Sequence, residues 1–135
     1  MKVLIDTNVI LDVLCNRKDF VEDSLKVFKY CEANRITGCI SALSIPNIVY
    51  IMRKELDNNR IKEILTTLTS IFTVLDLRES DLIKAADLEF SDYEDALQSV
   101  CAVRTKANYI VTRNVKDFND SPIPAIKPSE LLERI

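Results

Sequence analysis

The 135-residue chain contains no histidine, the side chain on which many catalytic sites depend. Without it, neither a Ser-His-Asp triad nor a Cys-His pair can form, and a metal site has no imidazole ligands. The single glycine, Gly38, also excludes the glycine-rich loops that bind nucleotide phosphates. Any metal site must therefore use oxygen ligands, which favours Mg²⁺ or Mn²⁺ over zinc or copper.

Long apolar runs are also missing. No segment approaches the roughly 20 apolar residues that cross a membrane, and Asp6 comes too early for a signal peptide. We therefore expect a cytoplasmic protein that does not contact a membrane. The cysteines have no metal-binding spacing and lie among apolar neighbours, so we expect reduced thiols in or near the core at Cys15, Cys31, Cys39 and Cys101.

The apolar content of 47% is typical of a globular protein. At this length it predicts one domain over residues 1–135 with a continuous core. The net charge of −3, from 18 basic and 21 acidic residues, is not typical of a nucleic-acid-binding protein. It does not exclude one, because acids gathered at a metal site bias the total and phosphate contact needs only a local basic rim.

Short apolar runs alternate with segments of helical periodicity, which predicts the α/β class with a mainly parallel sheet of four or five strands. The expected extended segments are residues 2–5, 37–41, 72–75, 109–112 and 123–126. About seven helices are expected: after Asp6, over 19–32, from 44, after a break at 58–59, from about 80, after 91 and from 128.

Acidic residues follow two of these strands and open one of the helices. Asp6 directly follows Val3-Leu4-Ile5, and Asp117 lies just beyond the strand at 109–112. Segments at the carboxyl ends of parallel strands meet in one crevice. Two carboxylates about 5 Å apart repel by roughly 3 kcal/mol at an effective dielectric constant of about 20. A cluster of them must bind a cation or hold protons, so we infer a divalent metal site and phosphate chemistry on a nucleic acid.

Each of these acids also has a structural interpretation. Asp6 can cap the following helix, although Thr7 and Asn8 can serve equally. In Ser91-Asp92-Tyr93-Glu94, Asp92 is a candidate cap and Glu94 fits the capping-box partner of Ser91. Asp95 has no such role and is the better metal-ligand candidate.

The segment 112–118 combines neutral and charged ligands. Thr112 and Asn114 offer neutral oxygens and Asp117 a carboxylate, while Arg113 and Lys116 are candidate phosphate contacts. An ordinary polar turn would have a similar composition, because Asn and Asp are common in turns.

Segments 5–9, 92–98 and 112–118 together resemble the signature segments of PIN domains, in order and over almost the whole chain. The resemblance implies a three-layer α/β/α fold and a Mg²⁺- or Mn²⁺-dependent ribonuclease, as in the toxins of bacterial toxin–antitoxin pairs. It assigns catalysis and metal binding to Asp6, Asp95 and Asp117. Asn114 would join the metal site, with Thr112 and Asp92 as accessory groups.

One position departs from the family pattern. PIN domains usually place a glutamate in the helix after the second strand, and Asn47 stands at that position. An amide oxygen can bind a hard cation but brings no charge. We therefore expect Asn47 to be a weaker ligand and metal affinity or activity to be reduced or lost.

The resemblance also implies partners. We expect single-stranded or loop RNA as the substrate, an antitoxin protein as a candidate partner, and a homodimer formed through residues 19–32 and 46–68.

Two alternative functions stay open: an RNA- or protein-binding module with a weakened site, and a phosphatase with Asp6 as nucleophile. In the phosphatase, Asn8 stands where the general acid should be.

Overall fold

The computed structural model describes all 135 residues. A sheet of five parallel strands lies at its centre, in the order β3-β2-β1-β4-β5. The strands are β1 (Lys2–Ile5), β2 (Thr37–Ser41), β3 (Thr73–Leu75), β4 (Tyr109–Val111) and β5 (Ala125–Ile126). The helices are α1 (Thr7–Leu14), α2 (Val21–Glu32), α3 (Ser44–Met52), α4 (Asn58–Ile71), α5 (Glu79–Ala86), α6 (Tyr93–Arg104), the 3-10 helix η1 (Val115–Phe118) and α7 (Pro128–Leu132).

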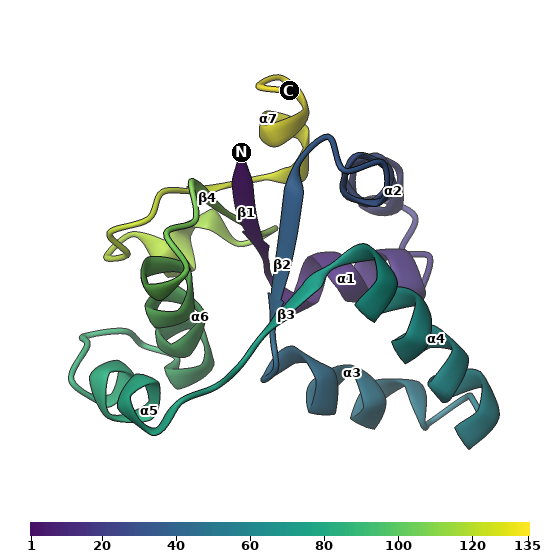
Figure 1. Cartoon of the computed structure of the whole chain (residues 1–135), viewed down its shortest axis with the longest axis horizontal. Coiled ribbons are helices and arrows are strands. Elements are labelled where there is room, and N and C mark those ends of the chain that lie inside the picture. The colour runs from purple at the N-terminus through teal and green to yellow at the C-terminus, as the bar shows by residue number, and fades with distance from the viewer.

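The helices cover both faces of the sheet, which confirms the predicted three-layer α/β/α fold (Figure 1). α1, α2 and α4 lie on one face, and α5 and α6 lie on the other. β1 is the central strand, and Val3, Leu4 and Ile5 are fully buried because helices cover both of its faces. None of the helices combines the length and apolar character that crossing a bilayer requires.

Packing behind β2 explains the single glycine. A Cβ atom at Gly38 would lie 2.6 Å from the Sγ of Cys31 and 2.8 Å from a ring carbon of Phe72. Any larger residue would therefore push α2 or the end of α4 away from the sheet. Phe72 also packs edge-on against Phe28, with ring centroids 4.9 Å apart.

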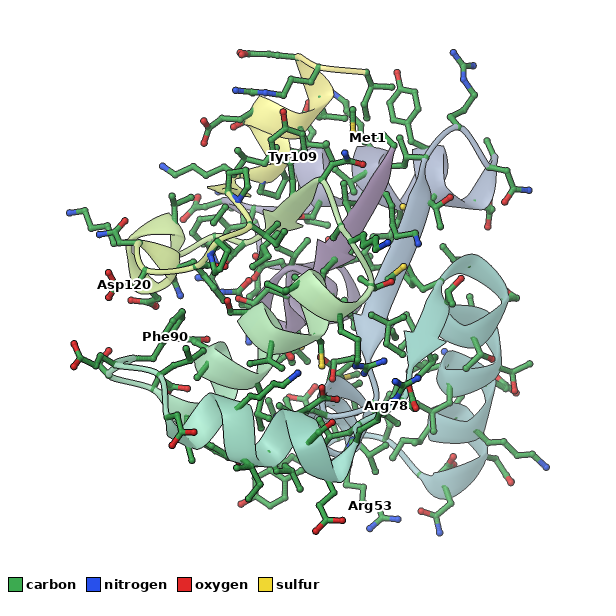
Figure 2. The ribbon with its side chains drawn as sticks, turned by 60° about the vertical axis from the view of Figure 1, so that its left-hand side comes forward. Met1, Arg53, Arg78, Phe90, Tyr109 and Asp120 are labelled. Carbon is green, nitrogen blue, oxygen red and sulfur yellow. The ribbon has the colours of Figure 1, made fainter.

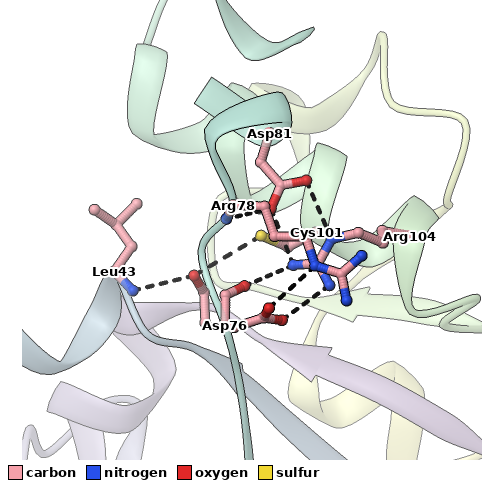
Figure 3. Close-up of polar contacts among 7 residues, drawn as sticks. Leu43, Asp76, Arg78, Asp81, Cys101 and Arg104 are labelled. Atoms are coloured by element: carbon pink, nitrogen blue, oxygen red, sulfur yellow. Dashed lines mark hydrogen bonds and ion pairs between the residues drawn. The ribbon is translucent and has the colours of Figure 1, made fainter. Parts of the chain in front are cut away.

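Arg104, the last residue of α6, fastens α5 to α6 (Figure 3). Its Nε and Nη2 atoms donate to the two carboxylate oxygens of Asp81 at 3.1 and 3.0 Å, and Nη1 donates to Asp76 at 3.1 Å. Burial works to raise the pKa of Asp81, which is 1% exposed, but the bonds from Arg104 and from the Arg78 amide hold it below its usual range.

Three sequence-based expectations about local structure are wrong. Asn58 and Asn59 do not break a helix but begin α4, because Asp57 caps it by accepting from the Arg60 amide. Phe72 ends α4 instead of starting β3. Cys15 is exposed, unlike the other three free cysteines, because it lies at the end of α1.

Candidate active site

The parallel strands end where the sheet order reverses. From β1 the chain builds β2 and β3 on one side and later β4 and β5 on the other, so β1 and β4 flank the switch point. In Figure 2, Met1 and Tyr109 lie where β1 and β4 begin, and Arg53, beyond α3, lies at the opposite end. An open pocket of about 570 Å³ at that opposite end is lined by residues that follow β1 and β4. Ligands of open α/β sheets bind in this kind of crevice.

Asp6 forms the floor of the pocket and is 7% exposed. Its amide donates to the Val111 carbonyl at 2.9 Å, which extends the pairing of β1 with β4. Its carboxylate accepts from the Thr7 amide at 2.8 Å, so Asp6 itself caps α1, and from the Thr112 hydroxyl at 2.8 Å. Burial raises its pKa despite these two bonds, and the charges of Asp117 and Asp92 act in the same direction.

Asp92 and Asp95 enter the pocket from the start of α6. Asp92 is the N-cap and accepts from the Asp95 amide at 3.0 Å. Because the helix begins at Tyr93, the expected capping box between Ser91 and Glu94 is wrong by one position. The Asp95 side chain is left for the pocket, where burial, followed by the charges of Asp6 and Asp92, raises its pKa to about 7.

Asp117 and Asn114 also line the pocket, from the segment that follows β4. Asn114 precedes η1 and Asp117 lies within it, and both are exposed. The segment that carries Asn114 and Asp117 is held to the end of β4, because the Asn114 amide donates to Thr112 Oγ1 at 3.1 Å. Thr112 is fully buried, so it contributes by orienting Asp6 and the turn.

Asn47 and Glu94 also line the pocket, from α3 and α6. The Asn47 side-chain amide donates to a carboxylate oxygen of Glu94 at 3.3 Å. Asn47 therefore faces the carboxylates, as the comparison with the PIN pattern predicts. Glu94 was assigned only a capping role from the sequence, and it contributes a further carboxylate to the pocket.

A small polar network beneath the pocket was missed by the sequence analysis. The hydroxyls of Thr7 and Ser44 lie 2.7 Å apart, and Gln98 Nε2 donates to Ser44 Oγ at 3.2 Å. These contacts join α1, α3 and α6, which carry pocket residues. Gln98 is 2% exposed, and its Oε1 atom has no hydrogen-bond partner. Its i+3 spacing from Asp95 was the signal that it shares a helix face with that residue.

Lys54 and Tyr50 form one rim of the pocket and were also missed. Lys54 is the only basic residue among five lining carboxylates, and its ammonium lies 5.3 Å from the centre of the Tyr50 ring. Tyr50 is 70% exposed. Lys54 follows Asn47 by seven residues, a spacing that returns a helix to the same face.

The basic residues expected to meet phosphate lie elsewhere. Arg113 Nε lies 3.1 Å from Asp12 Oδ2 and forms an ion pair with it, although the geometry is not that of a hydrogen bond. The guanidinium carbon lies 4.3 Å from the centre of the Phe20 ring. It lines a different cavity, because Asp12 is buried and draws the guanidinium away. Lys116 is exposed but does not line the carboxylate pocket. Arg113 is therefore engaged away from the pocket, whereas phosphate contact by Lys116 stays a prediction.

The candidate metal ligands around this pocket are carboxylate and amide oxygen atoms, which Mg²⁺ and Mn²⁺ prefer. No three of the acidic side chains already lie at metal-binding spacing, as expected for carboxylates that repel one another. Two observations fit a cation here: the raised pKa values of Asp6 and Asp95, and the unpartnered oxygen of Gln98. The residues therefore have the chemistry to hold a hard divalent ion once their side chains come together around it.

Known proteins resemble this chain in sequence or in fold. A ribonuclease VapC1 from Aquifex aeolicus is 26% identical over 138 residues, which cover 98% of this chain and 94% of that protein. A toxin–antitoxin complex from Klebsiella pneumoniae superimposes with a TM-score of 0.72 at 20% identity, over 93% of this chain and 97% of that one. DNA-bound VapBC from Salmonella typhimurium also gives a TM-score of 0.72 at 20% identity, over 95% and 98%.

The family of this chain is identified by a sequence match over most of its length. A sequence model of the PIN domain family matches residues 2–116, from the start of β1 into η1. The match includes the three segments on which the resemblance was first seen, except for the last two residues of the third. The five-stranded parallel sheet and the pocket at the carboxyl ends of its strands agree with it. The chain belongs to the PIN domain family.

Proposed function

We propose that this protein is a ribonuclease that hydrolyses single-stranded or loop RNA with the help of Mg²⁺ or Mn²⁺. The observation that carries the proposal is the pocket in which Asp6, Asp95 and Asp117 come together from three separate segments. The similarity to a ribonuclease VapC1 supports the same activity.

Asp6, Asp95 and Asp117 would hold the cation, with the amide oxygens of Asn114 and Asn47 as neutral ligands. When bound, the ion supplies charge stabilisation at the scissile phosphate and makes water a stronger acid. Thr112 keeps Asp6 oriented, and Asp92 fixes the start of the helix that carries Asp95. In the metal-free pocket the raised pKa values of Asp6 and Asp95 mean that both carboxylates bind protons more readily than free aspartates, so a cation would compete with protons for them.

The rim of the pocket fits a single-stranded substrate. Tyr50 presents an exposed aromatic ring on which an unpaired base can stack, and Lys54 beside it can meet a phosphate. In duplex RNA the bases are stacked on one another and unavailable to such a ring. Tyr50 and Lys54 are therefore the proposed RNA contacts at the pocket, and Lys116 stays a candidate phosphate contact outside it.

The test is cleavage of a labelled single-stranded RNA by the purified protein with Mn²⁺. We expect cleavage to stop with EDTA and to fall at least a hundredfold, or about 2.7 kcal/mol of transition-state stabilisation, in Asp6→Asn and Asp95→Asn. The matched control is Asp120→Asn, an exposed aspartate outside the pocket. Cleavage that survives in both pocket variants would come from a contaminating nuclease and would refute the proposal.

A binding module without activity is the second candidate, because Asn47 removes a charge from the pocket. Its signature in the same assay is RNA binding with no Mn²⁺-dependent cleavage. The phosphatase hypothesis is disfavoured, because Asn8 stands where the general acid of such an enzyme should be.

We further propose that the protein acts as the toxin of a pair and binds an antitoxin protein. The support is similarity to a Klebsiella pneumoniae structure described as a toxin–antitoxin complex. Expression of the wild-type chain should stop growth, and expression of Asp6→Asn should not. Rescue by a co-expressed neighbouring gene product that copurifies with the chain would identify the antitoxin.

A further inference from the structure

The pocket lacks a charge on α3 and has an additional one on α6. Asn47 contributes a neutral amide from α3, and Glu94 contributes a carboxylate from the first turn of α6. The two side chains meet, because Asn47 Nδ2 donates to Glu94 Oε2 at 3.3 Å. A carboxylate oxygen is thus held within hydrogen-bond distance of the α3 side chain.

Glu94 has no other role in the structure. Asp92 caps α6, so Glu94 is not needed to satisfy the helix start. It makes no ion pair with any lysine or arginine. The helix dipole favours an acid in the first turn, but this effect does not require the side chain to reach α3.

A second residue of the same helix points to a ligand between these groups. Gln98 follows Glu94 by four residues, so both lie on the α6 face that lines the pocket. Gln98 is 2% exposed, its Nε2 atom donates to Ser44, and its Oε1 atom has no partner. A buried oxygen without a donor is costly in a folded protein, and a hydrated cation would provide donors for it.

We propose that Glu94 supplies the carboxylate that α3 lacks, as a ligand of the divalent cation, and that Asn47 acts as a positioning residue that holds Glu94 toward the pocket. The inference rests on the proposed metal-dependent function. Asn47 then does not mean that the site has lost a negative charge. The carboxylate that PIN domains usually place on α3 is supplied from α6 instead. In this arrangement Asn47 holds Glu94 in place instead of binding the ion itself, and the charged ligands are Asp6, Glu94, Asp95 and Asp117.

The test returns the carboxylate from α6 to α3 by exchanging the two side chains. Manganese affinity is measured by calorimetry on EDTA-dialysed protein, without RNA, for the wild type, Glu94→Gln, Asn47→Ala and the exchange variant Asn47→Glu/Glu94→Gln. We expect Kd to rise at least tenfold in Glu94→Gln and to return to within about threefold of the wild type in the exchange variant. Asn47→Ala should raise Kd less, and should add nothing to Glu94→Gln, because it acts through that side chain.

Glu89→Gln is the matched control, since it makes the same change at an exposed site outside the pocket. Circular dichroism of each metal-free variant checks that the fold is intact. A Kd for Glu94→Gln equal to that of Glu89→Gln overturns the assignment of Glu94. Failure of the exchange variant to recover affinity overturns the transfer of charge from α3 to α6. Absence of binding to the wild type at millimolar manganese overturns this inference and the metal site together, whereas binding lost in Asp6→Asn but kept in Glu94→Gln overturns the inference alone.

Discussion

Thr112 and Asp6, 106 positions apart in the chain, are joined by a hydrogen bond of 2.8 Å beneath the pocket. The hydroxyl of Thr112 donates to one carboxylate oxygen of Asp6 and accepts from the Asn114 amide. This one side chain therefore couples the end of β1 to the turn that carries Asp117. It also opposes the effect of burial on the Asp6 pKa, so it favours the charged form that binds a cation.

Replacing Thr112 by valine keeps the volume and removes this bond. We expect the free energy of unfolding near neutral pH to fall by about 1.5–3 kcal/mol, the value of a hydrogen bond to a charged group. Manganese affinity should weaken, because Asp6 loses a partner that favours ionisation. Urea unfolding and calorimetry measure the two effects. Thr37→Val, an exposed threonine in β2, is the control, and equal losses in both variants would contradict the role assigned to Thr112.

The raised pKa of Asp95 predicts a pH-dependent stability in the absence of metal. The folded protein releases the Asp95 proton near pH 7, whereas the unfolded chain releases it near the model value of 3.8. Between these values the native state holds more protons, so stability falls as pH rises. In EDTA, the stability of Asp95→Asn relative to the wild type should increase from pH 4.5 to pH 7.5. A pH-independent difference, measured by urea unfolding, would show that Asp95 titrates normally.

Arg104→Met tests the ion pair of Figure 3. The substitution leaves the Asp81 carboxylate, 1% exposed, without its charged partner, and we expect a loss of about 3–5 kcal/mol. Asp81→Asn/Arg104→Met should recover part of this loss, because no buried charge is then left unpaired. Denaturant unfolding measures the stability. The contact lies outside the pocket, so manganese affinity should be unchanged, and a large change would contradict that separation.

Tyr50 and Lys54 should contribute differently to RNA binding. Tyr50→Ala removes a stacking surface, which is worth about 1–3 kcal/mol per base. Lys54→Gln removes one phosphate contact, so the slope of log K against log salt should become shallower by about 0.7. Fluorescence anisotropy with a single-stranded RNA, on an Asp6→Asn background that prevents cleavage, gives both quantities.

The expected homodimer offers a competing explanation for the exposed face of α3. Light scattering on wild type and Tyr50→Ala decides between the two. A dimer that dissociates in Tyr50→Ala while RNA affinity is unchanged would assign Tyr50 to a subunit interface. An unchanged molar mass together with weaker RNA binding would support the stacking role.

Sequence reasoning was most successful where a feature depends on neighbouring residues. The apolar run Val3-Leu4-Ile5 identifies β1 as a buried strand. A carboxylate that directly follows it must lie at the carboxyl end of that strand. Because the strands alternate with helices, their carboxyl ends share one edge. The fold and the meeting of Asp6, Asp95 and Asp117 in one pocket follow from these patterns.

Features that depend on competition between distant side chains were not accessible in this way. Arg113 pairs with Asp12 because that aspartate is buried, and the sequence does not show that a polar residue of α1 faces inward. Both Asp92, as a cap, and Ser91, in a capping box with Glu94, fit the sequence at the start of α6, and only the geometry of the helix start shows that Asp92 is the cap. The contact of Glu94 with Asn47 requires the relative placement of α3 and α6.

The order in which the pocket residues leave the ribosome has a consequence for the cell. Asp6 is synthesised long before Asp117, and β4 cannot pair with β1 until residues 109–111 have been made. A nascent chain that has not reached this segment therefore lacks part of the pocket. Under the proposed function, such a chain cannot cleave the messenger from which it is being translated, and activity begins only after Asp117 has been made.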